Sequence, residues 1–145
     1  MEQEREAKVW QRVAEQKEVR IHHGNQGLIR ESGELAAIYR RMAEKMTGKE
    51  KQLARKLYEL EQANRACLRG IALLSGAGAD STKPWVPGKG DEKGQLMRCY
   101  HRTQHSQAEY MARSLDPEYG CVYRELALRQ ERQCALLAEL LGWLG

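Results

Sequence analysis

The sequence predicts an all-α protein, a bundle of four long helices preceded by a short N-terminal helix. Residues with high helix propensity dominate the chain, Phe is absent and there are only 3 Pro. Four stretches place apolar residues three and four positions apart, which is the pattern of a helix that buries one face. Because 145 residues most simply form one domain with its own core, we expect residues 1–145 to be a single bundle.

Composition and charge exclude several classes of protein. The net charge is +4, and Lys and Arg alternate with Glu along the helical stretches, as on a solvated helix face. The chain has no nucleic-acid motif, no run of about 18 apolar residues and no apolar segment near its N-terminus. We therefore expect a cytoplasmic protein that binds neither nucleic acid nor membranes.

The first two helical stretches follow a charged lead-in. Residues 2–18 place Val9, Trp10 and Val13 at helical spacing and predict the short N-terminal helix. The first long helix is predicted at residues 26–46, and its stripe consists of Leu28, Ser32, Leu35, Tyr39, Met42 and Met46. The second is predicted at residues 49–74, with Glu61 beside a stripe of Leu53, Leu57, Leu60, Asn64, Cys67, Ile71 and Leu74.

Residues 76–94 predict a long crossover between the second and third helices. This segment holds five glycines and places Trp85 between Pro84 and Pro87. Connections between neighbouring antiparallel helices usually span about 2–8 residues. A longer one allows the third helix to begin at the same end as the second, as in bundles with one crossover. We expect Trp85 to pin the crossover to the bundle.

The last two helices are predicted on either side of a turn. The third spans residues 93–114, with a stripe of Leu96, Tyr100, Thr103, Gln107 and Tyr110. The fourth starts with Asp116 as N-cap and Pro117 at its first position, and ends at Gly142. Its stripe consists of Tyr123, Leu126, Gln130, Gln133, Leu137 and Leu140.

Polar residues interrupt all four apolar stripes near their middle. A polar side chain in a buried stripe needs a partner inside the protein, or it costs free energy. We expect these residues to lie at one level of the bundle as the remains of a central site. They are Ser32, Glu61, Asn64, Thr103, Gln130 and Gln133.

Several runs of residues resemble a known superfamily. They are Leu-Ala-Ala-Ile-Tyr-Arg-Arg-Met-Ala at 35–43, Leu-Glu-Gln-Ala-Asn at 60–64, Leu-Arg-Gly-Ile at 68–71, Arg-Cys-Tyr at 98–100 and Leu-Asp-Pro-Glu-Tyr-Gly at 115–120. Together they make residues 26–142 similar to the ferritin-like superfamily, and in particular to small rubrerythrin-like proteins of anaerobic bacteria. The resemblance implies a left-handed bundle with one crossover and a homo-oligomer such as a dimer.

The resemblance also implies where a diiron site would lie. Diiron members place one Glu on each of two helices and Glu-x-x-His on each of the other two. These positions correspond here to Ser32 and Thr103, to Glu61 with Asn64, and to Gln130 with Gln133. Only Glu61 keeps a carboxylate, whereas two divalent ions in a low-dielectric core need several. We therefore expect a degenerate site, no cofactor and little peroxidase or ferroxidase activity.

Other metal sites are weaker alternatives. Sliding the fourth helix by one residue would bring in Glu131, but it would also turn Tyr123 and Leu137 away from the core. His101 and His105 are four residues apart, a spacing that suits a metal, yet the apolar stripe points them toward solvent. His22 and His23 are adjacent and therefore do not share a helix face. The 4 Cys show no Cys-x-x-Cys spacing, which predicts buried reduced thiols.

Three functional interpretations stay open. The first is a ferritin-like bundle that has lost its diiron site and serves as a binding or structural module. The second is an iron-dependent oxidoreductase or peroxidase that uses an atypical site around Glu61, with iron or another divalent metal and help from Glu34, Glu131 or a histidine. The third is a bundle whose function lies on a surface that binds a second copy or a protein partner.

Overall fold

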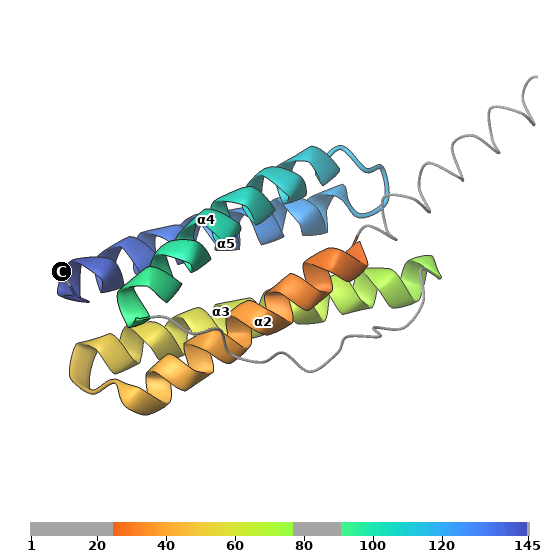
Figure 1. Cartoon of the computed structure of the whole chain (residues 1–145). Coiled ribbons are helices and arrows are strands. Elements are labelled where there is room, and N and C mark those ends of the chain that lie inside the picture. The colour runs from red at the N-terminus through yellow and green to blue at the C-terminus, as the bar shows by residue number, and fades with distance from the viewer. Residues whose placement is uncertain (1–24, 77–90, 145) are drawn as a thin grey trace, which may run out of the picture.

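The computed structural model describes residues 25–76 and 91–144, and all of its regular structure there is helical (Figure 1). The four helices are α2 (Asn25–Lys45), α3 (Gly48–Ser75), α4 (Glu92–Arg113) and α5 (Gly120–Leu144). The prediction of an all-α protein with four long helices is therefore confirmed. The predicted helix at 2–18, the two N-terminal histidines, Trp85 and most of the crossover at 76–94 lie outside the described residues.

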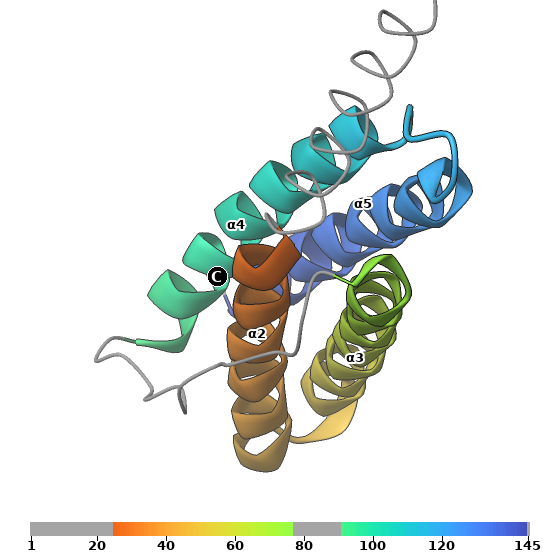
Figure 2. The same ribbon diagram turned by 90° about the vertical axis from the view of Figure 1, so that its right-hand side faces the viewer.

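The helices form two antiparallel hairpins that pack against each other. One hairpin joins α2 to α3 and the other joins α4 to α5, and the contacts between hairpins run mainly through α3 and α5 (Figures 1 and 2). Only a few residues bring α2 close to α4. Helices α3 and α4 begin at the same end of the bundle (Figure 1). Each hairpin thus contributes two helices to a shared interior.

The helix ends follow from local backbone chemistry. Gly76 adopts a left-handed conformation (φ 73°), and its N–H bonds to the carbonyls at the end of α3, so glycine closes this helix as usual. At the start of α4, the Asp91 carboxylate accepts a hydrogen bond of 2.8 Å from the N–H of Gly94. None of the described helices has an apolar stretch that could span a bilayer.

The predicted start of the fourth helix is confirmed for the cap at Asp116 but not for the first helical position at Pro117. The Asp116 carboxylate does accept hydrogen bonds from the N–H groups of Glu118 and Tyr119, at 3.1 and 2.7 Å, but residues 117–119 form a turn. Helix α5 begins at Gly120, where an added Cβ would lie 2.4 Å from the Ser114 carbonyl oxygen. The backbone of the α4–α5 turn thus leaves no room for a side chain at position 120, which explains the glycine at the first residue of α5.

The apolar core is divided into two clusters, and each draws on all four helices. The first lies toward the α2–α3 turn and includes Leu35, Met42, Leu57, Leu96 and Leu137. The second lies toward the α4–α5 turn and includes Leu28, Leu68, Tyr110, Tyr123 and Leu126. The six polar residues that interrupt the predicted stripes lie between these clusters along their helices.

The predicted stripes of the first and last helices are buried in full. The predicted stripes of the second and third helices include residues that are exposed or only partly buried. On α3, Leu74 is 79% exposed although Ile71 and Ala72 beside it are buried, and Leu60, two heptads earlier on the same flank of the helix, is only partly buried. On α4, Cys99 and Ser106 are buried where Tyr100 and Gln107 were expected. Small side chains at these two positions allow α4 to approach its neighbours closely.

The cysteines only partly match the prediction. All four are free thiols, but only Cys99 is buried, Cys121 is exposed, and Cys67 and Cys134 are intermediate. Burial raises the pKa of the Cys99 thiol to about 12, so this side chain acts as a small hydrophobic residue.

Candidate functional site

The candidate site is the polar level between the two apolar clusters, which we call the central polar layer. All six predicted residues are buried there: Ser32 is 2% exposed and the other five are 0% exposed. Because Gln130 and Gln133 are completely buried, the proposed register of the fourth helix holds and Glu131 is exposed. The layer consists of Ser32, Glu61, Asn64, Thr103, Gln130 and Gln133.

Gln133 connects the layer across the two hairpins. Its side-chain oxygen accepts a hydrogen bond of 2.8 Å from Asn64 Nδ2, and its Nε2 donates to Glu61 Oε2 at 2.5 Å. Ser32 Oγ donates to the backbone carbonyl of Glu61 at 3.3 Å. The Gln133 side chain on α5 therefore bonds to residues on two successive turns of α3. Ser32 on α2 bonds to the backbone of one of these residues, Glu61.

Other polar atoms of the layer have no direct partner. Within the described residues, no hydrogen bond reaches Glu61 Oε1, Asn64 Oδ1, Thr103 Oγ1 or either polar atom of the Gln130 side chain. We expected the buried amides and Glu61 to bond to one another or to ordered water, and direct bonds confirm this for Glu61, Asn64 and Gln133, whereas Gln130 has no direct partner in the described residues. Buried polar atoms of this kind are usually satisfied by ordered water.

The environment of Glu61 changes its acidity. Desolvation raises the pKa of the carboxyl to about 7, against the opposing influence of the nearby Ser32 hydroxyl and of the Gln133 amide that donates to the carboxyl. The charge of Glu31 raises it further, and that of Arg102 lowers it. Glu61 is therefore divided between its neutral and charged forms near neutral pH. The neighbouring Tyr39 hydroxyl stays protonated, because burial raises its pKa well above the ordinary value.

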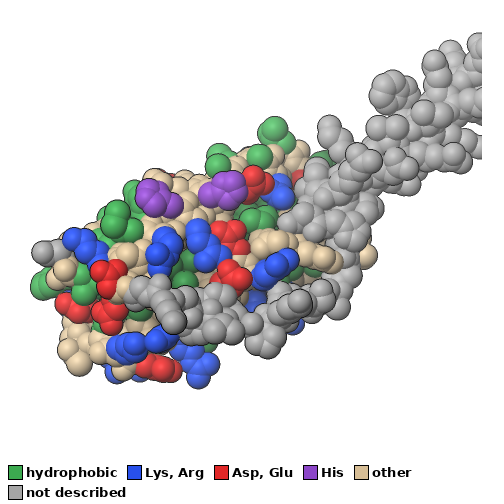
Figure 3. Space-filling view, viewed as in Figure 1, with side chains coloured by type: hydrophobic (Ala, Val, Ile, Leu, Met, Phe, Trp, Pro, Cys, Tyr) green, Lys and Arg blue, Asp and Glu red, His purple; other side chains and the backbone are tan. Residues whose placement is uncertain are grey.

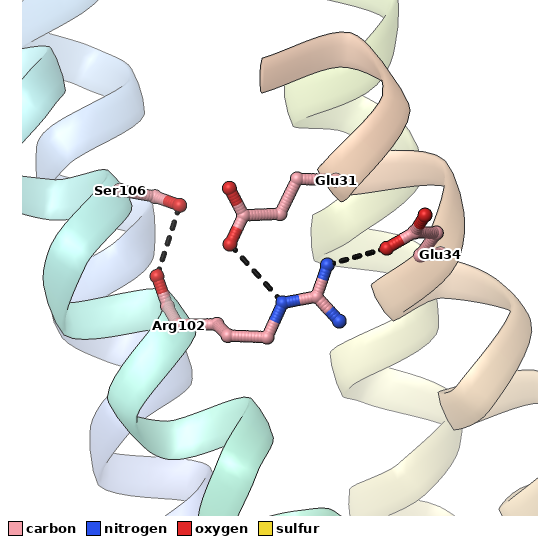
Figure 4. Close-up of polar contacts among 4 residues, drawn as sticks. All are labelled: Glu31, Glu34, Arg102 and Ser106. Atoms are coloured by element: carbon pink, nitrogen blue, oxygen red, sulfur yellow. Dashed lines mark hydrogen bonds and ion pairs between the residues drawn. The ribbon is translucent and has the colours of Figure 1, made fainter. Parts of the chain in front are cut away.

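A second polar group, which we call the Arg102 cluster, lies at the edge of the bundle between α2 and α4 (Figure 4). Arg102 Nε contacts Glu31 Oε1 at 3.2 Å and Nη2 contacts Glu34 Oε2 at 2.6 Å. On the same helix, Ser106 Oγ donates to the Arg102 carbonyl at 3.0 Å. Partial burial lowers the pKa of Arg102, but Glu34 and Glu31 more than offset this, so the guanidinium stays charged. The cluster joins the hairpins where few other contacts do.

The carboxylates that could have helped Glu61 to bind a metal are engaged or exposed. Glu34 pairs with Arg102, and Glu131 is exposed on α5. His101 and His105 are exposed as predicted, and the histidines of the described helices lie at the surface (Figure 3). Glu109 forms a 2.6 Å ion pair with Arg113 on its own helix. In residues 25–76 and 91–144, no three His, Cys, Asp or Glu side chains gather closely enough to hold a metal ion.

The residues of the central polar layer do not fit a diiron centre. Five of the six side chains are neutral amides or hydroxyls, so a single carboxyl would face two divalent cations. An amide N–H of Gln133 also points at the Glu61 oxygen that would serve as a ligand. The arrangement instead suits hydrogen bonding among neutral groups, with one carboxyl that exchanges a proton.

Sequence reasoning found all six residues of the layer but missed the Arg102 cluster. The sequence did contain a signal for this cluster. Glu31 and Glu34 flank the α2 stripe, and Arg102 lies directly before Thr103, a residue of the α4 stripe. Charged residues beside a stripe lie at the rim of a helix interface, where ion pairs between helices form.

Comparison of the chain with family models, with curated proteins and with solved structures gives no match in any of the three. Its function therefore has to be argued from its own geometry.

Proposed function

We propose that this chain is a ferritin-like bundle in which a neutral polar layer replaces the diiron centre, and that it serves as a non-catalytic binding or structural module. The parallel start of α3 and α4 supports this class of bundle, since a single crossover has that consequence. Support also comes from the burial of all six ligand positions between the two apolar clusters.

The hydrogen bonds of Gln133 are the observation that carries the proposal. In a diiron site the position of Gln133 would hold a histidine that offers a lone pair to a cation. Here it donates an N–H to Glu61 and accepts one from Asn64. A donor in that place opposes a cation and stabilises a carboxyl or carboxylate oxygen instead. Gln133 thus binds its two neighbours in the layer through hydrogen bonds that need no metal.

A structural role for the layer follows from its position. Apolar side chains can slide past one another, but buried hydrogen bonds between helices are satisfied in one register only, as a polar residue in a coiled-coil seam illustrates. The bonds of Gln133 fix α5 against α3 between the two apolar clusters, and the buried hydrogen bond of 2.7 Å from Asn25 to the Tyr123 hydroxyl joins α2 to α5 at the second cluster. We propose that the layer selects this alignment of the hairpins.

Metal analysis and ligand restoration test the proposal. Protein purified from iron-supplemented cells should contain no iron above background by elemental analysis. A redesigned protein with Ser32→Glu, Asn64→His, Thr103→Glu, Gln130→Glu and Gln133→His should bind two irons per chain. A matched control places Glu131→His and Arg132→Glu on the exposed face of α5 and should bind none. Stoichiometric iron in the wild-type protein would overturn the proposal.

A second candidate is an iron-dependent oxidoreductase with an atypical site at Glu61. Glu61 Oε1 favours it, because this oxygen is buried and has no hydrogen-bond partner in the described residues. If this candidate is right, iron in the wild-type protein should be stoichiometric and Glu61→Ala should remove it. Iron that persists in that variant would exclude the site.

A further inference from the structure

A hollow of about 360 Å³ lies between α2 and α3, on the side of the hairpin away from the central polar layer. Its α2 side is formed by the small residues Gly33, Ala36 and Ala37. A second hollow of about 230 Å³ continues it toward the α2–α3 turn and shares Arg40, Glu44 and Tyr58 with it. We call the two together the α2–α3 groove. Sites for small molecules begin at about 300 Å³, so the groove is large enough to hold one.

Positive charge dominates the lining of the groove. It contains five cationic side chains and one carboxylate, that of Glu44, and the cations are Arg40, Arg41, Lys51, Arg55 and Arg65. Glu44 contacts Arg40 at 3.6 Å, but both side chains are about two-thirds exposed, so this pair is weak and Arg40 can turn to another anion. Five cations and one carboxylate give the groove lining a formal charge of +4, which equals the net charge of the whole chain.

The walls of the groove hold donors in defined positions. The Arg65 guanidinium packs against Gly33, where an added Cβ would lie 3.4 Å from Cζ. The absence of a side chain at Gly33 thus allows Arg65 to lie close to α2. Gln62 Nε2 donates to the Tyr58 hydroxyl at 2.8 Å, which leaves the hydroxyl proton of Tyr58 to be donated to another group. Arginine and hydroxyl donors around a concave surface are the usual means of binding phosphate.

We propose that the α2–α3 groove binds a small anion with phosphate groups, such as a diphosphate, free or carried on an organic molecule. Phosphate oxygens accept paired hydrogen bonds from guanidinium groups, and the clustered cations neutralise more than one negative charge. The small side chains of α2 allow the anion to approach the helix, and Tyr58 donates from α3. This site is separate from the central polar layer and does not depend on whether that layer binds a metal.

Calorimetric titration of the full chain with inorganic pyrophosphate at low salt tests the site. We expect one equivalent to bind to the wild-type protein. In the Arg41→Gln/Arg65→Gln variant, binding should weaken by at least about tenfold, since charge-assisted hydrogen bonds are lost. The control Arg124→Gln/Arg132→Gln removes the same charge from exposed positions of α5 and should change the dissociation constant less than about twofold.

A third variant tests the groove without removing an arginine. Ala37→Glu introduces a carboxylate into the groove at a partly exposed position and uses a good helix former, so the fold should persist by circular dichroism while binding is lost. Tighter binding of adenosine diphosphate than of pyrophosphate would indicate that the ligand carries an organic group, and equal binding would indicate a free diphosphate. No binding to the wild-type protein, or equal weakening in the control, would overturn the proposal.

Discussion

Polar groups bridge the two hairpins at several places, and two of these bridges, one at the centre and one at the edge, differ in chemistry. At the centre, Gln133 joins α5 to Glu61 and Asn64 on α3 through amide hydrogen bonds in a fully buried setting. At the edge, Arg102 joins α4 to Glu31 and Glu34 on α2 through ion pairs whose side chains are 21–32% exposed.

The difference shows how access to water selects the bridging groups. Paired charges lose most of their hydration when they are buried, so a buried ion pair gains little over a well-packed neutral group. At the rim the charges keep part of their hydration, and the pair forms at little cost. Glu61 is the exception in the centre: it is a fully buried carboxyl with one amide partner, Gln133, and desolvation raises its pKa to about 7.

The largest effect is expected from Glu61→Gln. The pKa of Glu61 is raised from 4.5 to about 7 in the folded protein, so folding favours the protonated form. Wild-type stability from this residue is complete below about pH 4.5 and is lost as the pH rises to about 7. The neutral variant should therefore be more stable than the wild type by roughly 3 kcal/mol at pH 8 and by less than about 1 kcal/mol at pH 5.

Urea unfolding at these two pH values measures the difference. The exposed Glu125→Gln serves as the control and should show a small effect that hardly changes with pH. A stability difference between Glu61→Gln and wild type that is the same at pH 5 and pH 8 would show that Glu61 titrates normally.

The next largest change in stability is expected from removing the side chain of Gln133, which forms the central bridge. Gln133→Ala leaves Asn64 Nδ2 and Glu61 Oε2 without their mutual partner and should lower the free energy of unfolding by about 2 kcal/mol. The loss should be greater at pH 8, because the amide of Gln133 lowers the pKa of Glu61 and its removal makes ionisation more costly. Gln130→Ala is the matched comparison, since Gln130 makes no direct hydrogen bond, and it should cost less. Equal losses in the two variants would mean that only side-chain volume matters.

A smaller effect is expected from breaking the edge bridge. Arg102→Met removes both ion pairs but leaves Glu31 and Glu34 in contact with water, so the cost should be about 1 kcal/mol. Because the pairs are partly exposed, the cost should shrink in 1 M NaCl, which thermal unfolding at two salt concentrations can measure. Arg40→Met, which breaks an exposed pair within α2, should change stability less than Arg102→Met does. A salt-independent cost at Arg102 would indicate lost packing instead of lost charge.

The smallest changes in stability are expected when the two carboxylates of the edge bridge, Glu34 and Glu31, are replaced one at a time. Glu34 lies closer to Arg102 than Glu31 does, at 2.6 against 3.2 Å, so Glu34→Gln should cost about 0.5 kcal/mol and Glu31→Gln less. Removing the charge of Glu31 should also lower the pKa of Glu61, because that charge raises it. Carbon-detected NMR titration of the Glu61 carboxyl would show this as a shift of its midpoint to lower pH. An unchanged midpoint would indicate that the two bridges are electrostatically independent.

The fold and the central layer could be predicted from sequence because both depend on helical periodicity. A polar residue inside an apolar stripe, such as Asn64 or Gln130, must be buried wherever the stripe is buried. The start of α5 was predicted only in part: Asp116 caps the turn as its residue type predicts, but the regular helix begins three residues later than Pro117, at Gly120, where the backbone of the α4–α5 turn lies too close for a side chain.

The other errors of the prediction also arise from contacts between elements, which helical periodicity alone does not show. Leu74 follows the periodicity of α3 but lies where no other helix covers it, so its exposure is a property of the assembled bundle. The Arg102 cluster joins residues about 70 positions apart in the sequence, and each of them taken alone is typical of a solvated helix face.

The arrangement in two hairpins also has a consequence for the order of folding. Contacts within each hairpin are local in sequence, whereas Glu61 and Gln133 meet only after the hairpins dock. Local contacts form early at a small entropic cost, so each hairpin should form before the two associate. The central hydrogen bonds then belong to the last step, which means that weakening them should accelerate unfolding and hardly slow folding. The polar layer would thus determine how long the assembled bundle persists more than how fast it forms.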